Sequence, residues 1–105
     1  MNAQSNQIIP GCSHAELSFV KEVLINTFGE SSSFYLFGSR VTGTHKSSSD
    51  LDVLIDSDIP ISLELFTYAK EAFEDSHLTF KVDLLDKANL ASGFIERITP
   101  DLIIV

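Results

Sequence analysis

Asp50 and Asp52 are separated by one leucine at the start of an apolar run that extends to Ile55. If this run forms a strand, the two aspartate side chains point to the same face, because strand side chains alternate. Two adjacent carboxylates repel each other unless a proton or a cation lies between them. Mg²⁺, a hard ion that takes oxygen ligands, would bridge such a pair. An isolated Asp-x-Asp sequence is more often a solvated strand end, so the pair alone leaves both interpretations open.

The tripeptide Gly38-Ser39-Arg40 follows an aromatic run, and ten residues separate Ser39 from Asp50. A glycine directly after a strand lets backbone N–H groups approach an anion closely. A serine hydroxyl and an arginine guanidinium both suit phosphate oxygens. Ser49, directly before Asp50, is a further candidate for a phosphate contact. The alternative is a tight turn with Arg40 as a surface charge, but the spacing predicts a phosphate site beside the aspartate pair.

Hydrophobic periodicity predicts the elements that must position these residues. Ser13 and Glu16 have the spacing of a capping box, and Gly29 follows as a stop signal, which predicts a helix over 13–28. Two connections between expected strands are too short for parallel crossovers. We therefore expect an α/β (α+β) fold with a small mixed sheet of about four strands, flanked by helices. The expected strands are 34–37, 51–55, 78–85 and 102–105, and the further expected helices are 61–75 and 86–98.

The composition suits one small domain: the chain has 105 residues, of which 44% are hydrophobic. We expect a loose N-terminal leader over 1–12 and a single domain over 13–105. The net charge of −8 would repel phosphate backbones and anionic lipids, so neither direct nucleic-acid binding nor membrane association is expected. The absence of a long apolar run and of a signal-peptide pattern, together with the single Cys12, predicts a cytoplasmic protein.

The pattern Gly38-Ser39, ten residues, Asp50-x-Asp52, and then Asp83 in a later apolar run resembles the nucleotidyltransferases of the polymerase-beta-like superfamily. Within it, the chain resembles the minimal nucleotidyltransferase (MNT) family, whose members pair with HEPN-domain proteins (higher eukaryotes and prokaryotes nucleotide-binding). The resemblance runs from about residue 33 to the C-terminus. It implies the polymerase-beta-like nucleotidyltransferase core for the predicted mixed sheet.

The resemblance also implies site roles. Asp50, Asp52 and Asp83 would be the catalytic acids and would bind one or two Mg²⁺ ions, with ATP as the nucleotide donor. Gly38 and Ser39 would hold the terminal phosphates of the nucleotide. The residues expected to bind the nucleotide are Gly38, Ser39, Arg40 and Ser49.

Arg40 would neutralise phosphate charge in this scheme. One departure from the family pattern is Thr42, which stands where the family often has a second arginine, so that one positive charge is lost. Lys46 is near enough in sequence to substitute for it. This departure puts the affinity for the nucleotide in question, but not the metal site.

The function implied is Mg²⁺-dependent transfer of a nucleotide, AMP from ATP, to a hydroxyl of a partner protein. The partner would be a helical HEPN-domain toxin in a hetero-oligomer, and this chain would be the antitoxin of a type VII-like HEPN/MNT toxin–antitoxin pair. Two alternatives remain. The chain could be a non-catalytic nucleotide-binding antitoxin that neutralises its partner by complex formation, or a stand-alone small-molecule nucleotidyltransferase.

Overall fold

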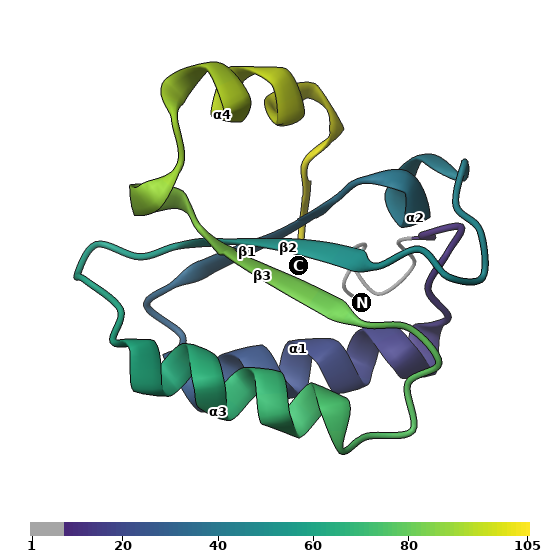
Figure 1. Ribbon diagram of the computed structural model, residues 1–105, viewed down its shortest axis with the longest axis horizontal. Coiled ribbons are helices and arrows are strands. Elements are labelled where there is room, and N and C mark those ends of the chain that lie inside the picture. Colours follow the sequence, from purple (N-terminus) through teal and green to yellow (C-terminus); the bar gives the residue numbers. More distant parts are fainter. Residues whose placement is uncertain (1–7) are drawn as a thin grey trace, which may run out of the picture.

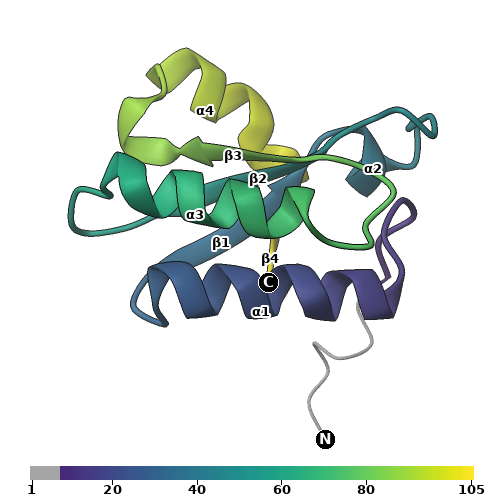
Figure 2. The ribbon, with the colours of Figure 1, turned by 60° about the horizontal axis from the view of Figure 1, so that its bottom comes forward.

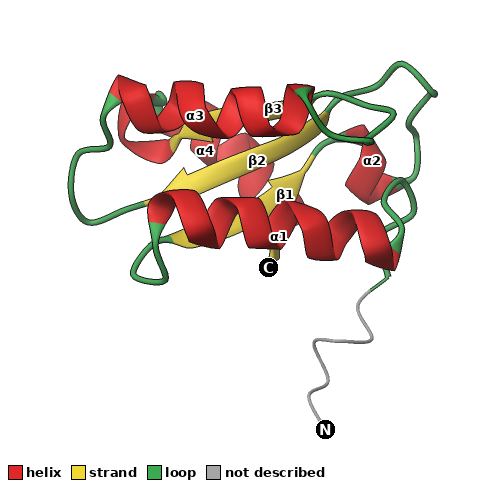
Figure 3. Cartoon of the chain, turned by 90° about the horizontal axis from the view of Figure 1, so that it is seen from below, coloured by secondary structure: helices red, strands yellow, loops and turns green. Residues whose placement is uncertain are grey.

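The computed structural model describes residues 8–105 and contains one four-stranded sheet, in the order β3-β2-β1-β4 (Figure 1). Two helices, α1 and α3, lie side by side across one face of this sheet (Figure 3), and α4 lies on the other side (Figure 2). The strands are β1 (Ser33–Phe37), β2 (Leu51–Asp56), β3 (Val82–Asp86) and β4 (Ile103–Ile104). The helices are α1 (His14–Phe28), α2 (Ser39–Thr42), α3 (Leu63–Glu74) and α4 (Ser92–Ile98).

The sheet is mixed, as the sequence predicts. Strand β1 pairs antiparallel with both β2 and β4, whereas β2 pairs parallel with β3. The parallel pair needs a long crossover, and α3 supplies it. The main core lies between the sheet and the helices α1 and α3. Its buried strand residues are Phe34, Leu36, Leu51, Val53, Ile55 and Val82, and its buried helix residues are Leu17, Val20, Leu24, Ala69 and Phe73.

Helix α1 begins and ends where its sequence signals place it. The Oγ atom of Ser13 accepts a hydrogen bond from the N–H of Glu16 at 3.1 Å, and Glu16 Oε1 accepts one from the N–H of Ser13 at 2.8 Å. This reciprocal pair satisfies N–H groups that have no partner within the helix. Helix α3 starts two residues later than expected, because Ser62 caps it by accepting a hydrogen bond from the N–H of Leu65.

The strand expected over 78–85 is wrong in its first half. Strand β3 begins only at Val82, because its neighbour β2 begins at Leu51, which pairs with Val82. A strand needs a partner for its backbone groups. The predicted alternation is nevertheless seen in packing, since Phe80 is buried and Leu78 packs against the core.

The helix expected over 86–98 is also wrong, because the segment divides. Asp86 Oδ1 accepts a hydrogen bond from the N–H of Ala88 and caps a 3₁₀ turn over Lys87–Asn89. The backbone then becomes extended at Leu90, and α4 starts at Ser92. Aspartate side chains often favour such short turns over helix propagation.

Residues 1–7 of the expected leader lie outside the described residues. For residues 9–12 the expectation of a loose segment is wrong, because Ile9 and Cys12 are buried and belong to the core. The N–H of Gly11 donates to the carbonyl of Arg40 at 2.8 Å, which fixes this segment against α2. Across residues 8–105, none of the helices combines the length and apolarity that a bilayer span requires.

Candidate active site

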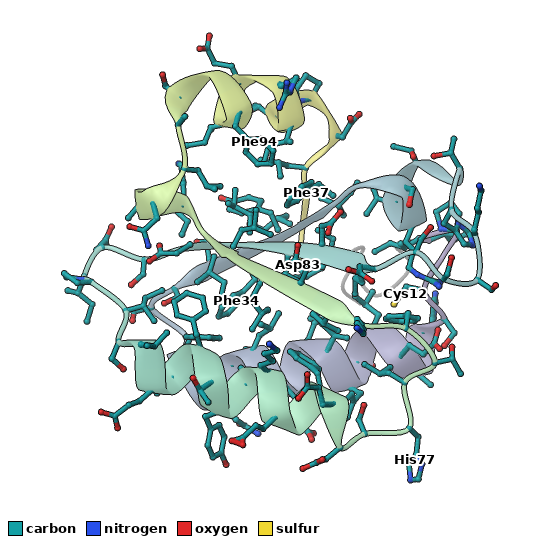
Figure 4. The ribbon with its side chains drawn as sticks, in the orientation of Figure 1. Cys12, Phe34, Phe37, His77, Asp83 and Phe94 are labelled. Carbon is teal, nitrogen blue, oxygen red and sulfur yellow. The ribbon has the colours of Figure 1, made fainter. Side chains whose placement is uncertain are left out.

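Asp52 and Asp83 are direct neighbours on the parallel strands β2 and β3. Their side chains project from the face of the sheet opposite the main core, since Leu51 and Val82, one position earlier on each strand, are buried on the core side. Asp83, labelled in Figure 4, is exposed, and Asp52 is partly buried. Asp50 is exposed and comes one residue before β2.

Asp52 is the carboxylate whose protonation its surroundings change. The pKa of Asp52 is raised from its ordinary value of 3.8 to about 6, chiefly because burial disfavours the charged form. The negative charges of Asp83 and Asp50 raise it further, in that order. Ionised Asp52 therefore stands among like charges, an arrangement that a cation would stabilise.

Gly38 brings the loop after β1 directly against Asp52. It has a φ of 91°, a conformation that favours glycine, and a Cβ atom built on it would clash with Oδ2 of Asp52. Any side chain at this position would displace the carboxylate. The structure thus places Gly38 against Asp52, while the role of the two residues in one site stays a prediction.

The short helix α2, which starts at Ser39, was not predicted from the sequence. The carbonyl of Gly38 accepts hydrogen bonds from the N–H groups of Val41 and Thr42 at 3.0 and 3.1 Å, and Gly43 ends the helix with a φ of 89°. The signal available in the sequence was the pair Gly38 and Gly43, which flank the four residues of this helix. Ser39, partly buried, thus follows the glycine that touches Asp52.

Arg40 does not have the role that the sequence predicted. Its side chain is only 7% exposed, and its guanidinium donates hydrogen bonds to the backbone instead of facing open solvent. Nε donates to the carbonyl of Ser49 and Nη1 to the carbonyl of Gly11, both at 2.8 Å. Nη2 donates to the carbonyls of Ser47 at 3.2 Å and Lys46 at 3.4 Å. With these donors committed, Arg40 holds the loop before β2 and is not free to neutralise phosphate.

Two further contacts fix this arginine. Its guanidinium carbon lies 4.2 Å from the centre of the Phe80 ring, a cation–π arrangement. A Cβ atom on Gly11 would clash with Arg40, so the N-terminal segment passes directly over it. Arg40, which we expected to neutralise phosphate, is therefore a buried junction between three segments of the chain that are distant in sequence.

Ser49 also acts within the loop. Its Oγ atom accepts a hydrogen bond from the N–H of Lys46 at 2.9 Å, closing a turn over 46–49. Its phosphate contact stays a prediction. Thr42, at the position of the missing second arginine, is exposed and shares a hydrogen bond with Thr44 at 3.1 Å. Lys46 is exposed as well.

A small apolar cluster lies on the same face of the sheet as the aspartates. Phe37 pairs in register with Asp52, and Leu54 is buried on the same side of β2. Phe94 of α4 meets Phe37 edge to face, with 6.3 Å between ring centres (Figure 4). Phe37 is therefore buried apart from the main core, where it bounds the site and contacts α4.

A model of the nucleotidyltransferase domain family matches residues 18–105, which include Gly38 and all three aspartates. The chain belongs to this nucleotidyltransferase family. It is 38% identical over 90 residues to the probable protein adenylyltransferase MntA of Haemophilus influenzae, covering 86% of this chain and 78% of that protein. It is 36% identical over 70 residues to the protein adenylyltransferase MntA of Thermococcus cleftensis, covering 67% of this chain and 70% of that protein. These similarities fit the minimal nucleotidyltransferases.

The fold of this nucleotidyltransferase is also similar to a solved structure described as a toxin–antitoxin with AMP-PNP. The TM-score is 0.68 at 20% sequence identity, and the match covers 83% of this chain and 69% of the other. At this identity the likeness concerns the fold alone.

The donor set of this nucleotidyltransferase fits a hard divalent cation. Within residues 8–105, no group of three or more histidine, cysteine, aspartate or glutamate side chains lies close enough together to hold a metal ion, so Asp50, Asp52 and Asp83 do not form a three-carboxylate metal site by themselves. Mg²⁺ is usually held by one or two carboxylates together with substrate phosphates, not by an all-protein cage. Asp52, whose pKa is raised chiefly by burial and further by the neighbouring carboxylates, could hold such an ion with Asp50 or Asp83.

Proposed function

We propose that this nucleotidyltransferase transfers AMP from ATP to a hydroxyl of a partner protein, in the presence of Mg²⁺, and so acts as the antitoxin to a HEPN-domain toxin. The observation that carries the proposal is the group formed by Asp50, Asp52 and Asp83 with Gly38 against it. The two relatives named as protein adenylyltransferases support a protein acceptor. The structural neighbour, described as a toxin–antitoxin with AMP-PNP, supports the nature of the partner and of the nucleotide.

The residues would divide the work as follows. Asp50 and Asp52 would hold Mg²⁺, which supplies positive charge to offset the triphosphate. Gly38 and Ser39 would position the phosphates. Asp83, which is exposed at the edge of the sheet, would accept the proton of the attacking hydroxyl. The hydroxyl oxygen bonds to the α-phosphorus, and the bond from that phosphorus to pyrophosphate breaks.

A direct test is to incubate the chain with Mg²⁺, ATP and its toxin and to measure the intact mass of the toxin. We expect a gain of one or more AMP units, lost when Asp52→Asn removes a carboxylate from the site. Asp101→Asn, a change at an exposed residue near the C-terminus, is the matched control and should transfer normally. No gain in mass with the unsubstituted chain would contradict the proposal.

One observation favours a second candidate, a non-catalytic nucleotide-binding antitoxin. Arg40 is committed to backbone carbonyls and Thr42 replaces an arginine, so the phosphate loop presents little positive charge. A toxin that is silenced in a stable complex without any change in mass would identify this second function.

A further inference from the structure

Strand β3 is an open edge of the sheet. In a parallel pair, the residues of a strand turn their backbone groups alternately toward the neighbour and away from it. The N–H of Leu51 donates to the carbonyl of Lys81 at 2.8 Å, so Lys81 and Asp83 turn toward β2. Val82 and Leu84 therefore turn their N–H and C=O groups outward. Within residues 8–105 these outward groups have no strand beside them, because β3 ends the sheet.

A groove follows this edge between β3 and α3, whose ribbons run alongside each other in Figure 1. One cavity of about 320 Å³ is lined by Leu63, Phe66, Thr67, Lys70, Val82, Asp83 and Leu84. A second, of about 280 Å³, adjoins it and shares Lys70 and Val82. Leu63, at the start of α3, is 79% exposed. The groove thus offers apolar surface beside unpaired backbone groups and reaches Asp83.

The lining of the groove itself is balanced in charge: Glu74 and Asp83 are its carboxylates, and Lys70 and Lys81 are its cations. Glu64 and Glu71 line a separate hollow that shares Leu63 and Thr67 with the groove. The chain as a whole carries a net charge of −8. A segment that carries basic residues would complement this net negative charge.

We propose that an extended, basic segment of the acceptor protein adds to the free edge of β3 as a fifth strand, an inference that rests on the proposed function. Backbone groups of Val82 and Leu84 would pair with this segment. Alternate side chains of an added strand point to opposite faces. Every second side chain of the added strand would enter the groove beside α3. The side chains that alternate with these would lie on the opposite face of the sheet, the face from which Asp83 projects. A hydroxyl side chain on that face is delivered to the carboxylate that accepts its proton.

Two variants test the pairing and the groove separately. Leu84→Pro removes an outward N–H on an edge strand, where proline is tolerated, and Leu63→Arg adds a repelling charge at an exposed position. We expect each to raise the KM for the toxin at least tenfold, with the KM for ATP within twofold. Ile104→Pro is the matched control, because Ile104 lies on the opposite edge strand, is 55% exposed and turns its N–H away from β1. An unchanged KM for the toxin in both variants would overturn the docking proposal.

Hydrogen exchange separates this proposal from the proposed activity. In the complex with the toxin, the amides of Val82 and Leu84 should exchange at least tenfold more slowly, while those of Asp83 and Leu85, already turned toward β2, change little. Protection without any AMP transfer would retain the docking site and reject the activity. Exchange at Val82 and Leu84 that is unchanged in the complex would reject the docking site, whether or not AMP is transferred.

Discussion

Asp52 is the residue at which the chemistry of the site and the stability of the fold compete. Burial and two neighbouring carboxylates raise its pKa to about 6, so the folded state binds a proton more readily than the unfolded state does. Linkage then requires that the contribution of Asp52 to stability is complete below about pH 4 and is lost as the pH rises through about 6. Near neutral pH, ionised Asp52 therefore lowers the stability of the folded protein, and a bound cation would offset this loss.

We therefore expect Asp52→Asn to stabilise the metal-free protein at pH 8, by a few degrees in unfolding temperature, because it removes a poorly solvated charge. The gain should shrink as the pH falls through 6 and vanish below about 4. Millimolar Mg²⁺ should also reduce the difference in unfolding temperature between the variant and the unsubstituted chain, because it stabilises only the unsubstituted chain. Thermal unfolding from pH 4 to 8 measures the difference in unfolding temperature, with Asp101→Asn as control. If Asp52→Asn were less stable than the unsubstituted chain at pH 8, the ionised carboxylate of Asp52 would not destabilise the fold, contrary to this prediction.

At the scale of elements, the loop between α2 and β2 depends on a buried arginine. The guanidinium of Arg40 donates in several directions to carbonyls of the loop and of Gly11. Lysine carries the same charge, but its single ammonium group cannot reach all of these acceptors. The orientation of Asp50 at the start of β2 follows from this loop.

Arg40→Lys should therefore destabilise the free protein by about 2 kcal/mol, since it leaves buried carbonyls without donors. This corresponds to a fall of roughly 10 °C in unfolding temperature for a domain of this size. Arg97→Lys, on the exposed side of α4, is the matched control and should change little. If Arg40 were instead a phosphate ligand, the substitution would weaken ATP binding and leave the unfolding temperature of the free protein unchanged.

The sequence predicted elements better than it predicted partners. The capping box, the two central strands and the mixed sheet rest on local patterns, and the structure has them. Strand β3 is shorter than its alternation suggests, because strand pairing depends on where β2 begins. The partners of Arg40 include a carbonyl 29 residues away in sequence, which no local pattern reveals.

The candidate site also has features that local sequence patterns predict and features that depend on the tertiary structure. The spacing of Gly38, Asp50 and Asp52 pointed to a common site, and the contact between Gly38 and Asp52 agrees with it. That Asp52 and Asp83 are adjacent depends on strand register, which the crossover through α3 sets. The function of Phe37 at the edge of the site depends on the position of α4, which follows a turn that the sequence did not indicate.

For the whole molecule, the net charge of −8 is confined to a fold with a radius of gyration of 13.2 Å. Like charges at this density repel one another and oppose the compact state. Salt shortens the range of this repulsion to roughly 3–10 Å between 1 M and 0.1 M ionic strength.

Raising the NaCl concentration from about 0.02 M to about 0.5 M at pH 8 should increase the unfolding temperature by a few degrees. The increase should disappear near pH 4.6, where the sequence is close to neutral overall. Calorimetry at the two pH values checks both statements. A fall in unfolding temperature with added salt at pH 8 would show that specific ion pairs outweigh the general repulsion.

The buried thiol of Cys12 makes the opening of the N-terminal segment, residues 9–12, measurable by its reaction rate. Burial, and then the charge of Glu16, raise the pKa of this thiol to about 11, against the opposing charge of Arg40. At neutral pH only roughly one ten-thousandth of such a thiol is ionised, and the thiolate is the form that reacts. It is the single cysteine of the chain. The rate at which an alkylating reagent consumes it therefore reports how often residues 9–12 lift away from Arg40, without any label being introduced.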